Sequence, residues 1–304
     1  MNLDPTPTPA LTLKGMNMTL KFMKYRRLAY LISGVLVALS ILSLATRGLN
    51  LGIDFAGGIA MEVSPINHEF TIERMRSDLG EFGAELQDVG GGHIMVRVGL
   101  PRGFTDEQQN ERVREIRAIL GENVEYVQTQ IVGPRIGGEL VRGGILAIVI
   151  SFLLMSLYVW IRYRGGYAVG ALVSLSLDFV LLFGFFSITG LEFTQISIAA
   201  ILMGIGYSIN DKVVNYDRID ENVRKYHKMP MTDLVDLSVN EMMRRTLTTS
   251  ASTALAMIGL FIFGGPLLQD FALTMTFAII MGVLTSIYVS NVILYHFNLR
   301  DSDS

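Results

Sequence analysis

Residues Gly143–Ile161 read GGILAIVISFLLMSLYVWI, and none of them carries a charge. A helix needs roughly 20 apolar residues to cross the hydrocarbon core of a bilayer, which is the length of this stretch. Five further apolar blocks of similar length occur along the chain. No water satisfies backbone groups inside the bilayer, so each block must be helical. The sequence therefore predicts six membrane-spanning helices, which we place at 28–46, 139–161, 167–188, 194–214, 244–264 and 271–297.

The composition also indicates an integral membrane protein. Half of the 304 residues are hydrophobic and only 17% are charged, which leaves too few polar residues to cover the surface of a soluble protein of this size. The chain has no cysteine, which excludes disulfides, thiolate metal sites and cysteine nucleophiles. The net charge of −3 says little, because the placement of charges in a membrane protein matters more than their sum.

The basic residues set the orientation. Lys and Arg occur in the N-terminal segment 1–27 and in the connections after the second and fourth spans, whereas Thr189–Phe193 and Gly264–Asp270 contain neither. Basic connections lie in the cytoplasm, so both termini, including the tail 298–304, are predicted there, together with the connector 215–243. A basic lead, an apolar stretch and the tripeptide Ser43–Ala45 also fit a cleavable signal peptide. The apolar stretch is longer than a usual signal core, which favours a retained helix.

The one sizeable loop, residues 47–138, falls outside the cytoplasm and has the patterning of a soluble domain. Apolar residues alternate in Ile59–Val63 and His93–Val98, and Asn123–Val132 follows as a third predicted strand. Helices are predicted over Thr71–Gly80 and Thr105–Leu120, each opened by a threonine cap, the second with an apolar stripe at Val113, Ile116, Ile119 and Leu120. Strands interleaved with two helices predict a small α+β ferredoxin-like domain.

The N-terminal segment consists of two different parts. Its Pro/Thr-rich beginning around Pro5–Pro9 is predicted to be disordered. The basic stretch Lys21–Arg27 is predicted to lie on anionic lipid headgroups.

The chain lacks the common motifs of enzymes. No G-x-x-x-x-G-K-[ST], G-x-S-x-G or H-E-x-x-H sequence occurs, and the four histidines lack metal-binding spacing. We expect no enzymatic activity, cofactor, metal site or nucleic-acid partner. Any work that the protein performs must then draw energy from a partner or an ion gradient.

Two aspartates lie within predicted spans: Asp178 in the middle of the third and Asp211 late in the fourth. An ionisable group inside a membrane is costly and is a functional candidate by default. The alternative for Asp211 is an interfacial cap, since Lys212 follows it.

Arg245 stands at the start of the fifth span, at a depth that matches Asp211 if the fourth and fifth spans lie antiparallel. This arrangement predicts an Asp–Arg pair, although Arg244 can take the same role, or both arginines can snorkel to the interface. Burial and a nearby arginine change the proton affinity of a carboxyl in opposite directions, so a helix movement can change its protonation. We therefore predict an ion-coupling site of Asp211, Arg245, Asp178, Asn210 and Ser208.

Hydroxyl residues surround this predicted site. They fit a proton-carrying water chain and small-residue helix packing equally well. They are Ser208, Thr246, Thr248, Thr249, Ser250, Ser252 and Thr253.

Four motifs resemble those of the SecF family, a branch of the RND superfamily. Gly206–Val223, GYSINDKVVNYDRIDENV, and Arg244–Ser250, RRTLTTS, are similar to the fourth- and fifth-helix signatures of that family. Leu51–Gly58, LGIDFAGG, and Val132–Leu140, VGPRIGGEL, resemble the entry to and exit from its extracytoplasmic domain. The resemblance is collinear from about residue 20 to 297.

The resemblance implies a six-helix RND-type unit in the cell inner membrane, with residues 47–138 in the periplasm. It implies a heterodimer with SecD that uses the proton motive force in late steps of protein export through SecYEG. The accessory proteins YajC and YidC, the unfolded exported polypeptide and the lipid bilayer are the other partners it implies. The essential aspartate and arginine of the family correspond to Asp211 and Arg245, and Asp178 matches an acidic position in the third helix.

Three positions depart from the family pattern: Ala56 replaces a common threonine, Lys212 a small hydroxyl residue and Asp220 an arginine. Lys212 can pair with Asp211 and change its proton affinity. The residues alone leave two other functions open, half of an exporter of small molecules or lipids and a structural scaffold without ion coupling. They also do not distinguish protons from sodium.

Overall fold

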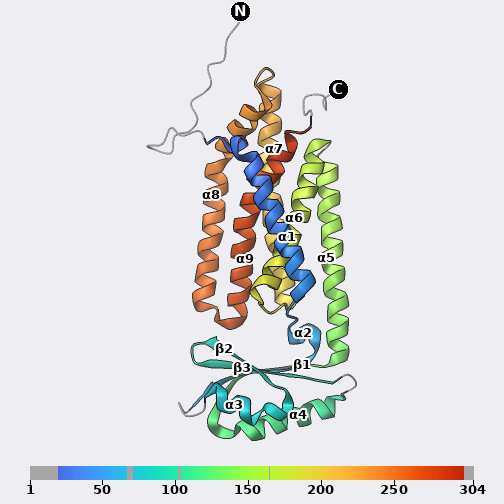
Figure 1. Ribbon diagram of the computed structural model, residues 1–304, viewed down its shortest axis with the longest axis vertical. Coiled ribbons are helices and arrows are strands. Elements are labelled where there is room, and N and C mark those ends of the chain that lie inside the picture. Colours follow the sequence, from blue (N-terminus) through green and yellow to red (C-terminus); the bar gives the residue numbers. More distant parts are fainter. Residues whose placement is uncertain (1–19, 67–70, 102–103, 164, 298–304) are drawn as a thin grey trace, which may run out of the picture.

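The computed structural model describes residues 20–66, 71–101, 104–163 and 165–297 (Figure 1). The Pro/Thr-rich beginning of the chain and the tail 298–304 lie outside these residues. Within them, six long helices form a bundle: α1 (Arg26–Arg47), α5 (Pro134–Arg162), α6 (Gly166–Thr189), α7 (Gln195–Lys225), α8 (Met231–Phe263) and α9 (Gly265–Thr285). The 3₁₀ turn η1 (Phe22–Tyr25) leads into α1, and α9 continues through a π-helical turn, η4 (Ser286–Ser290), into α10 (Asn291–Leu294).

Five of the described helical segments are long and apolar enough to cross a membrane, and α7 is not among them. Asn210, Asp211 and Lys212 interrupt its apolar residues, although α7 contains the predicted fourth segment 194–214. This helix contacts α5, α6, α8 and α9, so its polar residues can face protein instead of lipid. The central position of α7 in the bundle therefore allows this helix a lower average hydropathy than its neighbours.

The helices divide into an inner and an outer group. About 56% of the apolar window of α6 and 61% of that of α9 is buried, against 6% in both α5 and α8. Large apolar side chains on α1, α5 and α8 point away from the protein, among them Leu31, Leu154 and Leu255. Apolar surface of this extent is expected to contact lipid or another membrane-spanning chain.

A four-stranded antiparallel sheet with two helices on one face forms the domain between α1 and α5 (Figure 1). Its elements are β1 (Gly58–Pro65), α3 (Ile72–Asp78), β2 (Glu85–Gly90), β3 (His93–Gly99), α4 (Asp106–Leu120) and β4 (Val124–Val132). The strand order β2-β3-β1-β4 and the order of elements along the chain confirm the ferredoxin-like prediction. Met61, Met75, Leu79, Ile116 and Leu120 are almost fully buried between the sheet and its helices.

The sequence-based assignment missed strand β2 and misjudged two details of the helices. Strand β2 reads ELQDVG, a polar edge strand without apolar alternation. Thr105 caps α4 in a capping box with Gln108, as predicted, but Thr71 makes no side-chain cap hydrogen bond at α3. Ile119 is 37% exposed and so lies outside the buried stripe of α4.

The predicted connector 215–243 is largely helical. Helix α7 continues to Lys225, and α8 begins at Met231, so a turn of a few residues joins them. These two helical ends project beyond the rest of the bundle on the side away from the sheet (Figure 1).

The joint between the bundle and the sheet domain depends on a glycine pair. Gly57 follows the short helix α2 (Ile53–Ala56) with φ 74° and ψ 139°, a conformation that side chains rarely adopt. A Cβ on Gly58 would lie 2.8 Å from the backbone oxygen of Val98 in β3. Gly137 at the start of α5 packs against the backbone of α2 in the same way: a Cβ added to Gly137 would lie 3.1 Å from the backbone oxygen of Phe55. Entry and exit of the domain therefore lie against each other.

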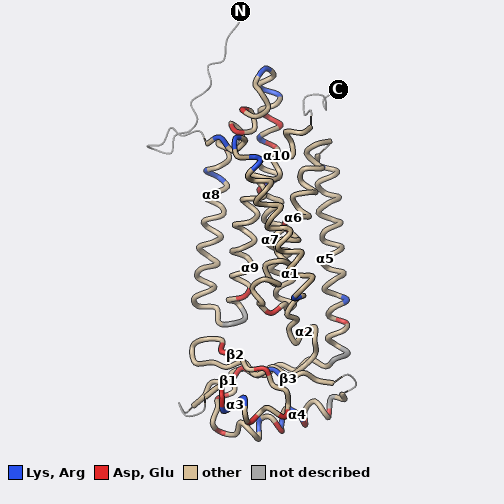
Figure 2. Tube along the Cα trace, viewed as in Figure 1, with Lys and Arg blue, Asp and Glu red and all other residues tan. Residues whose placement is uncertain are grey.

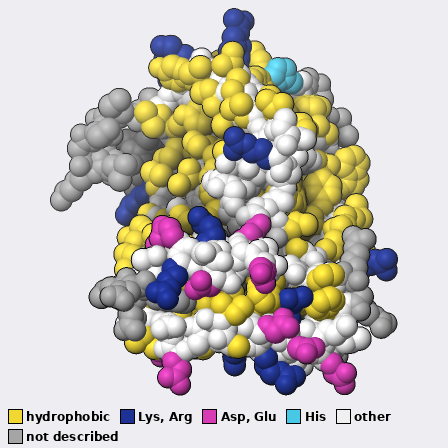
Figure 3. All heavy atoms as spheres, turned by 60° about the horizontal axis from the view of Figure 1, so that its bottom comes forward, with side chains coloured by type: hydrophobic (Ala, Val, Ile, Leu, Met, Phe, Trp, Pro, Cys, Tyr) yellow, Lys and Arg dark blue, Asp and Glu magenta, His cyan; other side chains and the backbone are white. Residues whose placement is uncertain are grey.

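Charges are concentrated at the two ends of the molecule. Figure 2 shows Lys and Arg at the end of the bundle away from the sheet, with few charges along the middle of the helices. Hydrophobic side chains cover the bundle and charged side chains of both signs the sheet domain in Figure 3. This distribution is expected of a bundle in a bilayer with its domain in water.

Candidate functional site

A cluster of charged and hydroxyl side chains occupies the interior of the bundle. Lys212 Nζ lies 2.6 Å from Asp178 Oδ2 on α6, 2.5 Å from Ser208 Oγ and 3.3 Å from Thr285 Oγ1 on α9. Asp178 also accepts hydrogen bonds from Ser208, at 2.7 Å, and from Thr285, at 2.6 Å. All four residues are at most 4% exposed. A salt bridge thus joins α6 and α7 inside the bundle, and the hydrogen bonds of Thr285 connect it to α9.

The helical repeat explains why Lys212 pairs with Asp178 and not with Asp211. Adjacent residues on a helix point about 100° apart, whereas residues four apart lie on one face. Lys212 therefore shares a face of α7 with Ser208, and this face meets α6 and α9. The expectation that Lys212 pairs with Asp211 is wrong.

Asp211 is buried without a full set of hydrogen bonds. It is 4% exposed, and its Oδ2 has no hydrogen-bond partner. The positive charges that act on it are those of Lys212 and Arg245. A buried carboxylate oxygen without a donor costs more than the neutral carboxyl does, so the surroundings of Asp211 suit a change in protonation.

Arg245 lies on α8, beside the α7 face that carries Asp211. Hydrogen bonds from Arg218 Nε (2.6 Å) and Asn222 Nδ2 (2.9 Å) to Glu241 Oε2 set the antiparallel register of the two helices. Continued at 1.5 Å per residue, this register brings Asp211 about level with Thr248–Ser250, roughly one turn from Arg245. Among the described residues, no ion pair joins Asp211 and Arg245, and the arginine is exposed. Arg245 thus acts on Asp211 by its charge, without contact.

The other predicted residues fall on two sides of α7. Ser208 is in the buried cluster, whereas Asn210 is exposed on the outer surface of the helix. The hydroxyls of Thr249, Ser252 and Thr253 donate to carbonyls of their own helix, four residues earlier. Among the hydroxyls of α8, Ser250 Oγ is buried and unpartnered.

Beyond the cluster, the α7–α8 interface remains polar. Asn215 Nδ2 and Asn222 Oδ1 are buried without partners on the face that carries Asp211. Unpartnered polar atoms of this kind are usual sites of bound water. On the same helix α7, the hydroxyl of Tyr216 accepts a hydrogen bond from Ser290 Oγ of the π-turn η4, 2.5 Å away. Single π-turns within helices often mark functional sites.

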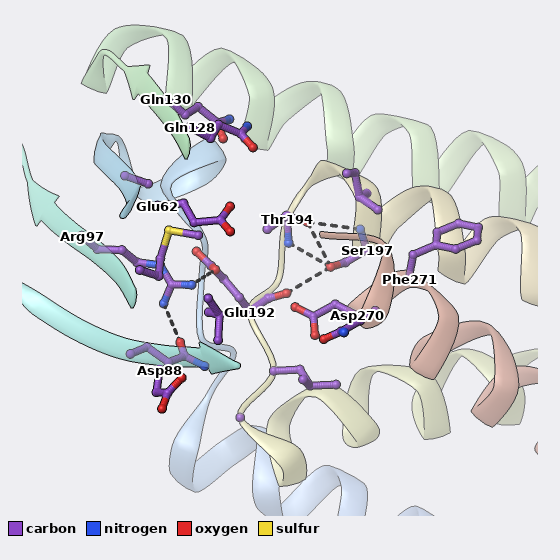
Figure 4. A pocket seen from close by; sticks show the side chains of 18 of the residues that line it. Glu62, Asp88, Arg97, Gln128, Gln130, Glu192, Thr194, Ser197, Asp270 and Phe271 are labelled. Carbon is purple, nitrogen blue, oxygen red and sulfur yellow. Dashed lines mark hydrogen bonds and ion pairs between the residues drawn. The ribbon is translucent and has the colours of Figure 1, made fainter. Parts of the chain in front are cut away.

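A second polar site lies between the sheet and the adjoining end of the bundle (Figure 4). It encloses about 350 Å³ and is lined by polar side chains from both parts. Arg97 of β3 forms a salt bridge with Glu192 in the loop between α6 and α7. Burial raises the pKa of Glu192, and the charge of Arg97 opposes that shift. The same loop pairs with the chain after α1, where the amide of Gly52 donates to Phe193 O at 2.9 Å.

Sequence reasoning missed three features of these sites. They are the pairing of Lys212 with Asp178, the participation of Thr285, and the salt bridge between Arg97 and Glu192. Lys212 was recognisable as a charge within a span that needs a buried partner. Thr285, Arg97 and Glu192 gave no signal, because their partners are distant in sequence.

Known proteins resemble the chain along most of its length. A family model described as "Protein export membrane protein SecD/SecF, C-terminal" matches residues 112–300, and one for the SecD/SecF GG motif matches residues 42–64. Protein translocase subunit SecF of Rickettsia felis is 38% identical over 287 residues, which cover 92% of each chain. The SecF subunit of Rickettsia prowazekii is 37% identical, over 92% of this chain and 91% of its own.

Two solved structures share the fold. A crystal structure of SecDF, a translocon-associated membrane protein from Thermus thermophilus, matches with a TM-score of 0.80 and 31% identity. A structure of SecDF in a super-membrane-facing form matches with a TM-score of 0.67 and 32% identity. The matches cover 91% and 93% of this chain but only 38% and 39% of the longer SecDF chains. With a family match over more than half of its residues and SecF relatives at 37–38% identity, the chain belongs to the SecF family of Sec protein translocase subunits.

Proposed function

We propose that this translocase subunit couples the proton motive force to late steps of protein export, together with a SecD-type partner. The observation that carries the proposal is Asp211, a carboxyl buried in the bundle with one oxygen unpartnered and the charge of Arg245 acting on it. The chain has no ATPase motif to supply energy in another way. It acts as a transport subunit and not as an enzyme.

The coupling step is a change in the separation of Asp211 and Arg245. When α8 brings the guanidinium closer, the ionised carboxyl is favoured; when α8 withdraws, burial favours the protonated form. Each elementary charge that crosses the membrane field contributes about 2.3 kcal/mol per 100 mV. Since one charge supplies so little energy, several protons must move for each mechanical cycle.

The orientation follows from the charge distribution. The basic end of the bundle lies in the cytoplasm with both termini, and residues 47–138 lie in the periplasm, as the positive-inside rule predicts. In this orientation the sheet domain stands where an exported polypeptide leaves the inner membrane.

A SecD-type subunit completes the membrane unit. The chain spans 38% of the SecDF chain of similar fold, and the outer faces of α5 and α8 are apolar and largely exposed. The SecYEG channel, YajC and YidC are further partners that the resemblance to the family suggests.

Asp211→Asn and Arg245→Met test the proposal directly. Both variants are expected to insert into the membrane and to lose the gradient-stimulated part of export. The measurement is import of a secretory precursor into inverted inner-membrane vesicles that contain the variant and its SecD-type partner, with and without a proton gradient. Asp220→Asn on the same helix is the matched control, because Asp220 pairs with Arg224 away from the cluster, at 3.0 Å. Normal gradient stimulation in Asp211→Asn would leave the scaffold function as the explanation.

A further inference from the structure

The four residues Asp178, Ser208, Lys212 and Thr285 form a closed hydrogen-bond network. An ammonium group has three protons to donate, and Lys212 has three acceptors: Asp178 Oδ2, Ser208 Oγ and Thr285 Oγ1. The two hydroxyl protons go to Asp178, from Ser208 to Oδ2 and from Thr285 to Oδ1. Every donor in the network therefore has an acceptor.

This count describes an ionised Asp178 and a charged Lys212. Its carboxylate oxygens receive hydrogen bonds from Lys212, Ser208 and Thr285, so a proton added to Asp178 would displace one of these donors. A neutral Lys212 would leave the carboxylate without a counter-charge in a buried site. The charged pair is favoured over its neutral tautomer because the hydroxyls of Ser208 and Thr285 also donate to the carboxylate of Asp178.

Asp211, the next carboxyl along α7, has the opposite surroundings. Its Oδ2 receives no hydrogen bond, so a proton can be added there without displacing a donor. The charged groups that act on it are Lys212 on its own helix and Arg245 on α8. Asp178 of α6 is paired with Lys212. Tyr207, one turn earlier on α7, also has an unpartnered buried hydroxyl.

We propose that Lys212 and Asp178 are a permanently ionised clamp, a pair of positioning residues that leave Asp211 as the carboxyl that exchanges a proton in the middle of the bundle. The proposal rests on the proposed function, and it assigns Asp178 a structural charge in place of a coupling role. Lys212 neutralises Asp178 and so prevents a second buried carboxyl from competing for the proton.

The clamp links the inner helices of the bundle. It joins α6, α7 and α9 at Thr285, the residue before the π-turn, whereas the α7–α8 interface contains the unpartnered atoms of Asp211, Asn215 and Ser250. Asp211 is thus carried by the linked helices, and Arg245 acts on it from α8.

Infrared difference spectroscopy during a pH titration tests the assignment. The full chain with its SecD-type partner is reconstituted in lipid, and the carbonyl stretch of protonated buried carboxyls is followed. The band that titrates in the wild type is expected to vanish in Asp211→Asn and to persist in Asp178→Asn. Lys212→Met is expected to add a second band, from Asp178 deprived of its counter-charge, that is absent from the Asp178→Asn/Lys212→Met double variant. Loss of the wild-type band in Asp178→Asn would overturn the proposal, as would a Lys212→Met spectrum without a new band.

Export in vesicles supplies a second readout. Lys212→Met should reduce gradient-stimulated export roughly tenfold or more, because Asp178 without its counter-charge takes up a proton and competes with Asp211. The double variant should recover most of it, since contacting residues are coupled in double-mutant cycles. Losses that simply multiply in the double variant would contradict the clamp. If Asp211→Asn keeps normal gradient stimulation, the coupling function fails, while the spectra still decide the protonation state of the clamp.

Discussion

At the scale of single residues, hydrogen-bond capacity distinguishes the two buried aspartates. Asp178 has its carboxylate surrounded by an ammonium and two hydroxyls, whereas Asp211 has an oxygen without a donor. Breaking a buried ion pair by removal of one partner typically costs 3–5 kcal/mol, on the order of a large part of total stability. In our proposal the same residue type is therefore a structural charge at one position and a proton-binding group at the other.

Thr285 offers a test of the network that leaves both charges in place. Thr285→Val removes the hydroxyl that donates to Asp178 and accepts from Lys212, and is expected to lower stability by about 1–3 kcal/mol. Thr276→Val is the control, since that hydroxyl donates to Ala272 O of its own helix, at 2.7 Å. The midpoints of thermal unfolding in detergent compare the two variants. Equal midpoints would show that the hydroxyl of Thr285 contributes nothing to the clamp.

Glu192 gives the molecule a pH dependence at the joint between sheet and bundle. Burial raises its pKa, and the charge of Arg97 opposes this upward shift. A carboxyl whose pKa is higher in the folded than in the unfolded chain stabilises the fold at low pH, and this contribution is lost as the pH rises through the raised value. We expect the wild type to lose stability relative to Glu192→Gln over the range that begins at the ordinary glutamate pKa of about 4.3 and extends to higher pH. Thermal unfolding of both proteins across this range measures the slope, and a slope of opposite sign would contradict the expectation.

At the scale of elements, close backbone contacts fix the sheet domain to the helices. Gly58 of β1 lies directly against Val98 of β3, and Gly57 has a backbone conformation that excludes most side chains. These two glycines connect α2 to the central strand of the sheet. The family pattern of two adjacent glycines thus has a steric reason here.

Gly58→Ala should force β1 and β3 apart, because its Cβ would lie 2.8 Å from a backbone oxygen. We expect a loss of about 1–3 kcal/mol, in the range of overpacking in a tightly packed site. Gly99→Ala is a matched control: Gly99 pairs with Gly58 in the sheet and has open space around the position of its Cβ. Chemical denaturation of both variants decides the matter, and equal stability would show that the close contact relaxes freely.

At the scale of the whole molecule, the sheet domain is an insertion between α1 and α5 with its two ends adjacent. Gly58 and Val132 are partners in the β1–β4 pair, so the chain enters and leaves the domain at one place. The Arg97–Glu192 bridge and the backbone pairing of Gly52 with Phe193 hold this place against the bundle. The domain is therefore inserted at a single place in the helical chain.

Deletion of residues 57–130 should leave a protein that inserts into the membrane but does not support export. The deletion joins neighbouring points of the chain, so the six helices need not rearrange. Membrane fractionation and protease accessibility check insertion, and secretion of a reporter checks function. Secretion at the wild-type level would show that the domain is dispensable.

The sequence by itself determined the helical membrane unit and its small ferredoxin-like domain, and it supplied the orientation and the candidate residues Asp211, Arg245 and Asp178 as predictions. Apolar blocks, basic connections and strand alternation are local in sequence, so each can be interpreted without knowledge of the fold. Strand β2 escaped because an edge strand exposed to solvent has no apolar alternation. The connector 215–243 was predicted to be charged and partly helical, and the structure extends α7 to Lys225 and begins α8 at Met231 within it.

Only the tertiary structure decided which charges pair. Adjacency in the chain favoured Lys212 with Asp211, but the helix turns neighbours away from each other, and α6 and α9 bring Asp178 and Thr285 to Lys212 across 34 and 73 residues of sequence. The packing of helices around α7 buries the Lys212–Asp178 pair and leaves Asp211 Oδ2 without a hydrogen-bond donor. Electrostatics at this site depends on distance in space, which the order of residues along the chain does not contain.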